Sequence, residues 1–291
     1  MGQVVILSAR QGWHTDQLCR AVRLRGHEPR IVPWEQLTSR MGRGSAVSGG
    51  GHQLADASAV LARIIPNGSL EQIIHRVDTL HRLEDDGVRV LNSARAIERS
   101  VDKAWASSLL ERAGLATPDT VVCEQIDEAF AAFRSMGDVV VKPLFGSMGL
   151  GMVRVSDEEM AFRVFRAIEQ VRGVFYLQRF VPHEGRDIRA FVVGDRVIGS
   201  IVRRSDGWRT NVSRGGKAES FTLPAGWSEM ALMAARAVGA EYAGVDLLPA
   251  RDGTVYLLEV NGIPGWRGLQ DATGIDVADA IIGQLLDRPP G

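Results

Sequence analysis

The apolar residues of the first 92 positions alternate between short strand-like runs and helical spacing. Four runs predict β-strands: 3-QVVILS-8, 29-PRIVPW-34, 58-SAVLARII-65 and 88-VRVLN-92. The spacing between them predicts helices from about Trp13 to Arg25 and from about Ser69 to Asp86. Strands that alternate with helices predict a small parallel sheet covered on both faces. The Gly- and Ser-rich stretch 42-GRGSAVSGGG-51 is expected to form a flexible surface loop.

Beyond residue 92 the pattern becomes richer in strands. Helices are predicted from about Ser100 to Gly114 and over residues 126–137, 157–172 and 228–239. Strands are predicted over residues 119–124, 138–144 and 174–181. Residues 188–203 read as a hairpin that turns at Gly194-Asp195, and residues 243–250 pair with 254–260 through the turn 251-RDG-253.

Composition narrows the class of protein. The chain has 291 residues, 45% of them apolar and 24% charged, with a formal net charge of -1, as in an ordinary soluble globular protein of two or three compact units. The near-neutral charge argues against a dedicated nucleic-acid binder. No window reaches the roughly 18 to 20 uncharged apolar residues of a membrane span. Cys19 and Cys123 have no motif spacing, which favours a reducing cytoplasm.

Lysine is rare in this chain. Of 34 basic residues only Lys103, Lys142 and Lys217 are lysine, and although a GC-rich genome explains the excess of arginine, it does not explain these three positions. Lys142 ends a predicted strand just before the loop 146-GSMGLG-151. Glycines let the backbone approach a ligand and turn its N–H groups towards an oligophosphate. The loop matches neither the Rossmann pattern nor the P-loop, because the lysine precedes it. An ordinary glycine-rich hairpin is the alternative.

A second candidate site lies at the end of the last predicted strand, in 259-EVNGIPGW-266. Glu259 and Asn261 are two residues apart and therefore share a face of the strand. The partner strand carries Asp246 in an otherwise apolar run, where a carboxylate needs compensation. Asp, Glu and Asn together offer the oxygen ligands that Mg²⁺ prefers. Solvent-facing polar residues at a sheet edge are the alternative.

A third candidate site is a basic stretch, 203-RR-204 and 209-RTNVSRGGK-217. Arg203 and Arg214 can each hold phosphate oxygens with two N–H groups. A solvated loop is an equally reasonable interpretation. Asp187 and Arg189 lie two residues apart, on one face of the strand that precedes this stretch.

The order of these motifs resembles the RimK-like α-L-glutamate ligase family of the ATP-grasp superfamily. The segments 142-KPLFGSMGLG-151, 182-PHEGRDIRAFVVGDRVI-198 and 259-EVNGIPGWRGLQDATGID-276 are most similar to the subgroup of tetrahydromethanopterin:α-L-glutamate ligases. The resemblance implies an α/β and α+β protein with the ATP-grasp fold. It implies a small parallel preATP-grasp α/β domain (1–92), a central lid domain with the glycine-rich loop (93–177) and a C-terminal domain with the metal site (178–291). ATP would lie between the last two domains.

The resemblance also assigns roles to residues by matching position. Those assigned to ATP are Lys103, Lys142, Gly146, Ser147, Met148, Gly149, Gly151, Gln178, Arg179, Phe180, Val181, Asp187, Arg189, Arg209, Thr210 and Asn211. Two Mg²⁺ ions, which Mn²⁺ can replace, would bind Asp246, Glu259 and Asn261, and the expected catalytic residues are Arg203, Arg214 and Asn211. The family commonly has an acidic residue at position 179, so a role for the Arg179 side chain is doubtful. Lys217 has no assigned role.

The chemistry implied is ATP-dependent ligation of L-glutamate to an acidic acceptor through an acyl phosphate, by a cytoplasmic enzyme that forms a dimer or a tetramer, with no nucleic-acid or membrane partner. A tetrahydromethanopterin-like coenzyme is the favoured acceptor. A protein C-terminus, an amino-group carrier protein, a deazaflavin or a methanofuran-type coenzyme are alternatives, as is a non-catalytic ATP-binding regulator. For Trp13, His14 and Trp266, packing and acceptor contact remain equal alternatives, and Arg10 and Arg267 are candidates to meet an acidic tail.

Overall fold

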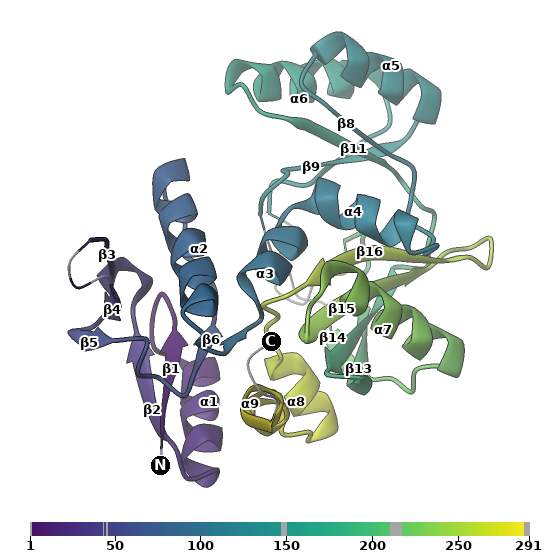
Figure 1. The fold of residues 1–291 in the computed structure, drawn as a ribbon. Coiled ribbons are helices and arrows are strands. Elements are labelled where there is room, and N and C mark those ends of the chain that lie inside the picture. Colours follow the sequence, from purple (N-terminus) through teal and green to yellow (C-terminus); the bar gives the residue numbers. More distant parts are fainter. Residues whose placement is uncertain (1, 43, 45, 147–149, 210–216, 288–291) are drawn as a thin grey trace.

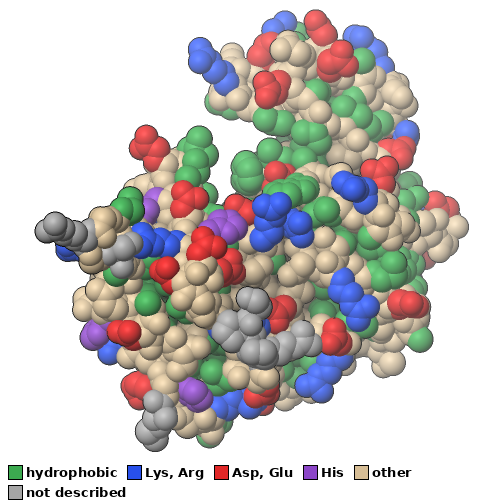
Figure 2. Space-filling view, in the orientation of Figure 1, with side chains coloured by type: hydrophobic (Ala, Val, Ile, Leu, Met, Phe, Trp, Pro, Cys, Tyr) green, Lys and Arg blue, Asp and Glu red, His purple; other side chains and the backbone are tan. Residues whose placement is uncertain are grey.

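The computed structural model describes residues 2–42, 44, 46–146, 150–209 and 217–287 (Figure 1). Three parts are visible: an N-terminal part that includes α1 and α2, a lid that carries α5 and α6, and a C-terminal part around β12–β16. Figure 2 shows an open notch between α2 and the lid, with basic and acidic side chains interspersed over this face.

The N-terminal part is a parallel four-stranded sheet in the order β2-β1-β6-β7, as the alternating pattern predicted. The Ser69 hydroxyl accepts a hydrogen bond from the Gln72 N–H and begins the second helix at the predicted place. The elements of this part are β1 (Gln3–Leu7), α1 (Trp13–Leu24), β2 (Glu28–Val32), β6 (Ala59–Ala62), α2 (Leu70–Asp85) and β7 (Val90–Leu91).

A small antiparallel sheet interrupts this part after β2. It comprises the 3-10 helix η1 (Trp34–Gln36) and the strands β3 (Leu37–Arg40), β4 (Ala46–Gly49) and β5 (His52–Gln53). The prediction of a flexible loop over residues 42–51 was therefore wrong for β4, in which Val47 is fully buried. Gly49 explains the composition, because a Cβ atom there would lie 2.7 Å from Val32 Cγ1. The glycine permits close packing rather than flexibility.

Two helices, α3 (Ala94–Val101) and α4 (Lys103–Arg112), stand where one helix from about Ser100 was predicted. The single-helix prediction was wrong because Asp102 adopts an extended conformation, with φ -85° and ψ 103°, and separates the two. The Asp102 carboxylate accepts a hydrogen bond from the Trp105 N–H, at 3.0 Å, and begins α4. Lys103 is thereby fixed as the first residue of a helix.

The lid is an antiparallel sheet in the order β10-β9-β11-β8, with its two helices on the face turned away from the C-terminal part (Figure 1). Its apolar core is its own and includes Phe133, Phe165 and Phe175. The lid elements are β8 (Thr120–Cys123), α5 (Ile126–Met136), β9 (Val139–Lys142), β10 (Val153–Val155), α6 (Glu158–Gln170) and β11 (Phe175–Arg179).

The C-terminal part is an antiparallel sheet in the order β14-β13-β12-β15-β16. The predicted hairpin turn at Gly194-Asp195 is confirmed between β12 and β13, as is the pairing of β15 with β16. The elements are β12 (Arg186–Val193), β13 (Arg196–Arg204), β14 (Lys217–Ser220), α7 (Ala225–Val238), β15 (Tyr242–Pro249), β16 (Val255–Asn261), α8 (Arg267–Thr273) and α9 (Val277–Asp287).

The apolar cores of the molecule do not coincide with its three parts. One core joins Ile6 and Leu18 of the N-terminal part to Phe191, Tyr242 and Ile281 of the C-terminal part. A second core packs α3, α4 and α7 against the opposite face of the C-terminal sheet. Helix α4 therefore packs with the C-terminal part, whereas α3 also contributes Ala94 and Ile97 to the core of the N-terminal part. The domain boundaries expected at residues 92 and 177 stay a prediction.

Asn92 links the N-terminal part to the C-terminal part through hydrogen bonds. Its side chain is fully buried. The amide nitrogen donates to the carbonyl oxygens of Tyr242 (2.8 Å) and Gly262 (2.6 Å), and the amide oxygen accepts from the N–H groups of Glu241 (2.8 Å) and Tyr242 (3.1 Å). Because all four bonding positions of the amide are used, this side chain fixes the loop that follows β16.

Candidate active site

A pocket with about 920 Å³ of open space lies between the lid sheet and the C-terminal sheet. The structure brings together in its wall many residues predicted from the sequence: Lys103, Lys142, Gly146, Gln178, Arg179, Phe180, Val181, Asp187, Arg203, Arg209, Asp246 and Glu259.

Other predicted residues lie elsewhere. Gly151, Arg189 and Asn261 are not among the described residues that line the pocket. Gly146 and Gly151 both have positive φ, at 151° and 76°, so the described ends of the predicted loop do require glycine. Six predicted residues lie outside the described ranges: Ser147, Met148, Gly149, Thr210, Asn211 and Arg214. Lys217 pairs with Arg204 in the sheet through its backbone.

Sequence reasoning missed the apolar part of the wall. These residues are Pro118, Val140, Pro143, Leu150, Met152, Trp208, Leu248 and Leu258, together with His183. Leu248 could have been found, because it lies two residues after Asp246 and shares its face. Leu258 could not. A β-bulge in β16 sets Glu259 opposite Asp246 and Leu257 opposite Leu247, so that Leu258 is an extra residue and lines the pocket beside Glu259.

Two lysines lie in the pocket wall near the Glu259 carboxylate. The Lys142 ammonium donates to Gln178 Oε1 at 2.5 Å, and Gln178 in turn donates to Thr120 Oγ1 at 3.1 Å. Burial lowers the pKa of Lys142 from 10.5 to about 8, although the Glu259 charge opposes this. Burial also lowers the pKa of Lys103, whose ammonium donates to the Gly146 carbonyl oxygen at 2.8 Å. At neutral pH these two cations can bind an oligophosphate.

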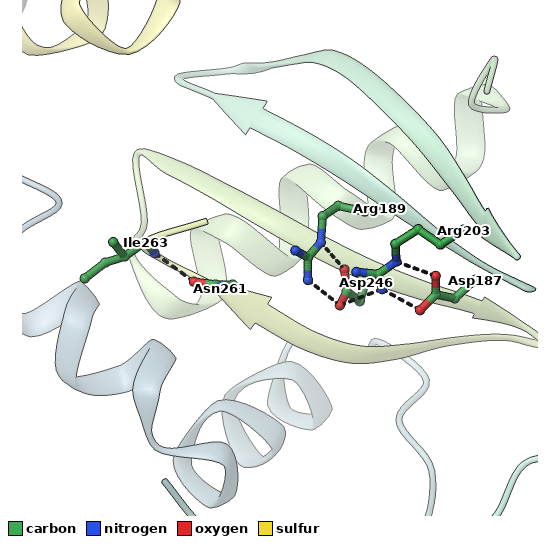
Figure 3. A network of polar contacts seen from close by, with 6 residues as sticks. All are labelled: Asp187, Arg189, Arg203, Asp246, Asn261 and Ile263. Atoms are coloured by element: carbon green, nitrogen blue, oxygen red, sulfur yellow. Dashed lines mark hydrogen bonds and ion pairs between the residues drawn. The ribbon is translucent and has the colours of Figure 1, made fainter. Parts of the chain in front are cut away.

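Two aspartates and two arginines form a charged network beside the pocket (Figure 3), and three of them, Asp187, Arg203 and Asp246, line its wall. Arg189 grips Asp246 with two hydrogen bonds, Nε to Oδ1 at 2.6 Å and Nη2 to Oδ2 at 2.7 Å. Arg203 Nη2 lies 3.0 Å from Asp246 Oδ2, and Arg203 also forms two hydrogen bonds with Asp187. The three buried members, Asp187, Arg203 and Asp246, are at most 4% exposed. Charge pairing of this kind is needed to keep ionised groups inside a protein.

The network sets the ionisation of its members. Burial raises the pKa of Asp246, but Arg189 and Arg203 outweigh this and hold the pKa at about 2. Burial lowers the pKa of Arg203, and the Asp246 and Asp187 carboxylates outweigh it, so the pKa of Arg203 is raised. Asp246 is therefore an anion at neutral pH. The expectation that Arg203 contacts phosphate oxygens remains a prediction, since both carboxylates bind its guanidinium in this structure.

Asp246 and Glu259, two of the three oxygen donors predicted to bind Mg²⁺, suit that ion and line the pocket. Asp246 and Glu259 are direct cross-strand partners, as the hairpin predicted. Asp246 accepts three N–H groups out of roughly four lone-pair positions that a carboxylate offers, which leaves room on Oδ1. The Glu259 carboxylate has no hydrogen bond or ion pair with any described residue. The Asn261 amide oxygen accepts from the Ile263 N–H at 2.9 Å (Figure 3).

Carboxylates alone would not complete a metal site here. Within the part of the chain that the structure describes, no three His, Cys, Asp or Glu side chains form a group that could hold a metal ion. Mg²⁺ usually binds one or two carboxylates and takes its other ligands from water and phosphate oxygens. The donor set therefore fits an Mg²⁺ ion that arrives with a nucleotide.

The side chain of Arg179, a residue of the pocket wall, is bound by two residues that do not line the pocket. Arg179 Nε donates to Asp119 at 2.8 Å, and its Nη1 donates to the Met136 carbonyl oxygen at 3.0 Å. A role for the Arg179 side chain in nucleotide binding was already doubtful from the sequence. The neighbouring Phe180 ring lies 3.6 Å from the Arg154 guanidinium carbon and lines the pocket.

Comparison with known proteins places this geometry in a family. A RimK-like ATP-grasp domain matches residues 100–285, and a RimK PreATP-grasp domain matches residues 3–97. The tetrahydromethanopterin:alpha-L-glutamate ligase of Methanosarcina acetivorans is 38% identical over 80% of this chain and 81% of its own. The ligase of the same name from Methanococcus maripaludis is 34% identical over 97% of both chains.

A solved structure supports the fold. The ATP-grasp ligase PsnB, in complex with a phosphomimetic variant of its minimal precursor, Mg and ADP, aligns with a TM-score of 0.74 at 21% identity over 98% of this chain and 97% of that chain. At this identity the likeness concerns the fold, which is that of an ATP-grasp protein with an N-terminal preATP-grasp domain, as expected. Among the described residues no helix is long and apolar enough to cross a membrane.

Proposed function

Because the chain belongs to the RimK-like ATP-grasp family of ligases, we propose that it joins L-glutamate to a carboxyl group of an acidic, tetrahydromethanopterin-like coenzyme and converts ATP to ADP and phosphate. The observation that carries this proposal is the pocket wall in which Lys103 and Lys142 lie near Glu259, the direct partner of Asp246. This arrangement combines cations for phosphate with oxygen donors for a divalent ion.

ATP binds between the two sheets in this proposal. The apolar residues Val140, Leu248 and Leu258 offer a dry surface for the adenine ring. Lys103 and Lys142 bind phosphate oxygens, and Lys103 also holds the Gly146 carbonyl at the start of the glycine-rich loop. Asp246, Glu259 and Asn261 would hold Mg²⁺, which neutralises charge on the phosphates and polarises the bond that breaks.

The acceptor carboxylate must first be activated, because a carboxylate is a poor electrophile. Attack of its oxygen on the γ-phosphorus of ATP breaks the bond to the β-phosphate oxygen and releases ADP, which leaves an acyl phosphate. The amino group of L-glutamate then attacks the acyl carbon, phosphate leaves, and the amine loses a proton. The protein needs no side-chain nucleophile for this sequence, and its contribution is positioning, charge neutralisation and exclusion of water.

The arginines of the pocket wall suit the second half of this reaction. Arg203 is held beside Asp246 and Asp187 in a fixed orientation, and in this proposal its guanidinium would stabilise the acyl phosphate. Arg214 and Asn211, outside the described residues, are proposed partners of the same intermediate. The Arg203 guanidinium is therefore already ordered before the substrate arrives.

The experiment that tests this proposal is product analysis with a panel of acceptors. The purified protein is incubated with ATP, Mg²⁺, L-glutamate and one of tetrahydromethanopterin, a deazaflavin coenzyme, methanofuran or a peptide, and products are identified by mass spectrometry. We expect one or more glutamyl residues on tetrahydromethanopterin, with one ADP released for each. Glu259→Gln is the matched control and should form no product. Tight ATP binding without ADP release for any acceptor would favour a regulatory nucleotide-binding protein instead.

A further inference from the structure

Arg63, directly after β6, is a buried cation with no anionic partner among the described residues. It is 3% exposed. Its Nη1 donates to Tyr242 Oη at 3.2 Å and its Nη2 donates to the Pro264 carbonyl oxygen at 3.1 Å, and both partners are neutral. No carboxylate of the described residues forms an ion pair with it. A buried guanidinium normally requires a counter-charge, so the position calls for an anion that the described residues do not supply.

Aromatic side chains surround this guanidinium. The Arg63 guanidinium carbon lies 4.8 Å from the centre of the Trp266 ring. The His14 ring packs edge-on against Trp266, at 4.6 Å, and against Trp13, at 4.9 Å. A second cation, Arg267, lies 5.7 Å from the Trp13 ring. We refer to Arg63, Trp13, His14, Trp266 and Arg267 as the Arg63 cluster.

The Arg63 cluster contains hydrogen-bond donors that lack an acceptor in the part of the chain that the structure describes. His14 Nε2 accepts from the Trp266 backbone N–H at 3.3 Å, so the proton of the neutral ring is on Nδ1. Burial lowers the pKa of His14 to about 4, with Arg63 and Arg267 adding to the effect, and the ring is neutral at pH 7. The buried indole N–H of Trp266 has no acceptor among the described residues. An anion in contact with the cluster would satisfy such donors.

The Arg63 cluster lies where the N-terminal sheet meets the loop that follows Asn261 at the end of β16. Arg63 and the start of α1 both follow the carboxyl ends of parallel strands, the edge at which open α/β sheets bind ligands. Pro264, which Arg63 contacts, is three residues beyond Asn261. Gly12, which begins α1, is exposed and has open space where a Cβ would be, and its N–H donates to the Thr15 hydroxyl oxygen at 2.8 Å. A ligand can therefore approach beside Trp13.

We propose that the Arg63 cluster binds the acidic acceptor, with an anionic group of the acceptor against Arg63 and Arg267 and its flat ring system against Trp13. This inference rests on the proposed function and names the surface that selects the substrate. Two cations beside an aromatic surface match a molecule that is both anionic and planar. L-Glutamate has carboxylates but no ring, so the indole surface would contribute nothing to its recognition.

The charge around the cluster supports an anionic ligand. The nearest acidic partner is Asp271, whose carboxylate lies 3.8 Å from Arg267 Nε, and both of those side chains are 66% exposed. An exposed pair of this kind is weak and opens readily for a stronger anion. Arg63 has no competing partner of this sort among the described residues.

The test separates acceptor binding from catalysis. Binding of tetrahydromethanopterin is measured by titration calorimetry, and KM is measured for tetrahydromethanopterin, L-glutamate and ATP. The variants are Arg267→Gln, at an exposed position, and Arg63→Lys, which keeps the charge but loses the planar fork. Arg23→Gln, an exposed position on α1, is the matched control. Circular dichroism confirms that each variant is folded.

We expect Arg267→Gln to raise both the Kd and the KM for tetrahydromethanopterin about tenfold, the loss of one charged contact. Arg63→Lys should raise them at least as much, while the KM values for ATP and L-glutamate stay within about twofold. Unchanged Kd in folded Arg267→Gln and Arg63→Lys would overturn the inference, as would a rise confined to the KM for L-glutamate. If the wild type binds tetrahydromethanopterin but forms no product, the proposed reaction fails, and weaker binding by Arg267→Gln still supports the site.

Discussion

Asp246 and Glu259 are both proposed metal ligands, yet the structure predicts that their loss has different effects on folding. Asp246 accepts three N–H groups from Arg189 and Arg203 inside the protein, whereas the Glu259 carboxylate has no such contact with a described residue. In Asp246→Asn an amide replaces the charge, and its N–H group would face guanidinium donors. Arg189 would then lose its only ion-pair partner among the described residues. We expect Asp246→Asn to unfold more easily and Glu259→Gln to remain stable.

The structure gives the size of this effect. Lowering the Asp246 pKa from 3.8 to about 2 corresponds to a favourable interaction with the charged form on the order of a few kcal/mol. Breaking one side of a buried pair typically costs about 3 to 5 kcal/mol. Asp246→Asn should therefore lower the Tm of the C-terminal part by roughly 10 °C. Glu259→Gln should change the free energy of unfolding by less than about 1 kcal/mol, since it breaks no direct contact with a described residue.

The assay is thermal unfolding followed by circular dichroism, without nucleotide or metal. The sign of the pH dependence is also defined. Because folding lowers the Asp246 pKa, its contribution is present above about pH 4 and disappears as the pH falls towards about 2. The difference in Tm between the wild type and Asp246→Asn should narrow over that range. If Asp246→Asn melts within about 2 °C of the wild type at pH 7, the ion-pair reasoning is wrong.

Three further predictions concern the pocket. Because the pKa of Lys142 is lowered to about 8, ADP affinity measured without metal should fall as the pH rises from about 7 to about 9. Lys142→Arg should remove that decline. A flat pH profile in the wild type would contradict the proposed contact between Lys142 and phosphate. Chelation of divalent ions should abolish ADP release and added Mg²⁺ should restore it, whereas turnover that survives chelation would refute the metal site at Asp246 and Glu259. Arg179→Ala should leave the KM for ATP within about twofold, because the side chain is occupied by Asp119 on the surface, and a tenfold rise would show that it contacts the nucleotide.

The pairing of Asp246 with Glu259 could be predicted from the sequence because local rules determine it. Strands have a period of two residues, and a short turn leaves few choices of register, so the two carboxylates had to fall close together. The parallel sheet of the first part was predictable for a similar reason, since strands that alternate with helices can pair in few ways.

The partners of Asp246 could not be predicted in this way. Arg189 and Arg203 reach it from β12 and β13, and that contact depends on β15 inserting beside β12 after a long connection. Chain order does not determine sheet order across such a connection. The bulge at Leu258 and the strand that ends at Gly49 could not be predicted from the sequence for another reason. Each depends on a backbone arrangement that alternation and composition do not report.

The apolar core that joins the N-terminal part to the C-terminal part limits how this chain can be divided into fragments or recombined with relatives. Residues 1–92 lack the partners of Ile6 and Leu18 that lie on β12, β15 and α9, so this fragment made alone would expose an apolar face and aggregate. The segment from β8 to β11 has a core of its own and joins the rest at two chain crossings. We expect that this segment can be exchanged between relatives as a unit. A chimaera should acquire the acceptor preference of a relative only when it contains both the N-terminal and the C-terminal part of that relative.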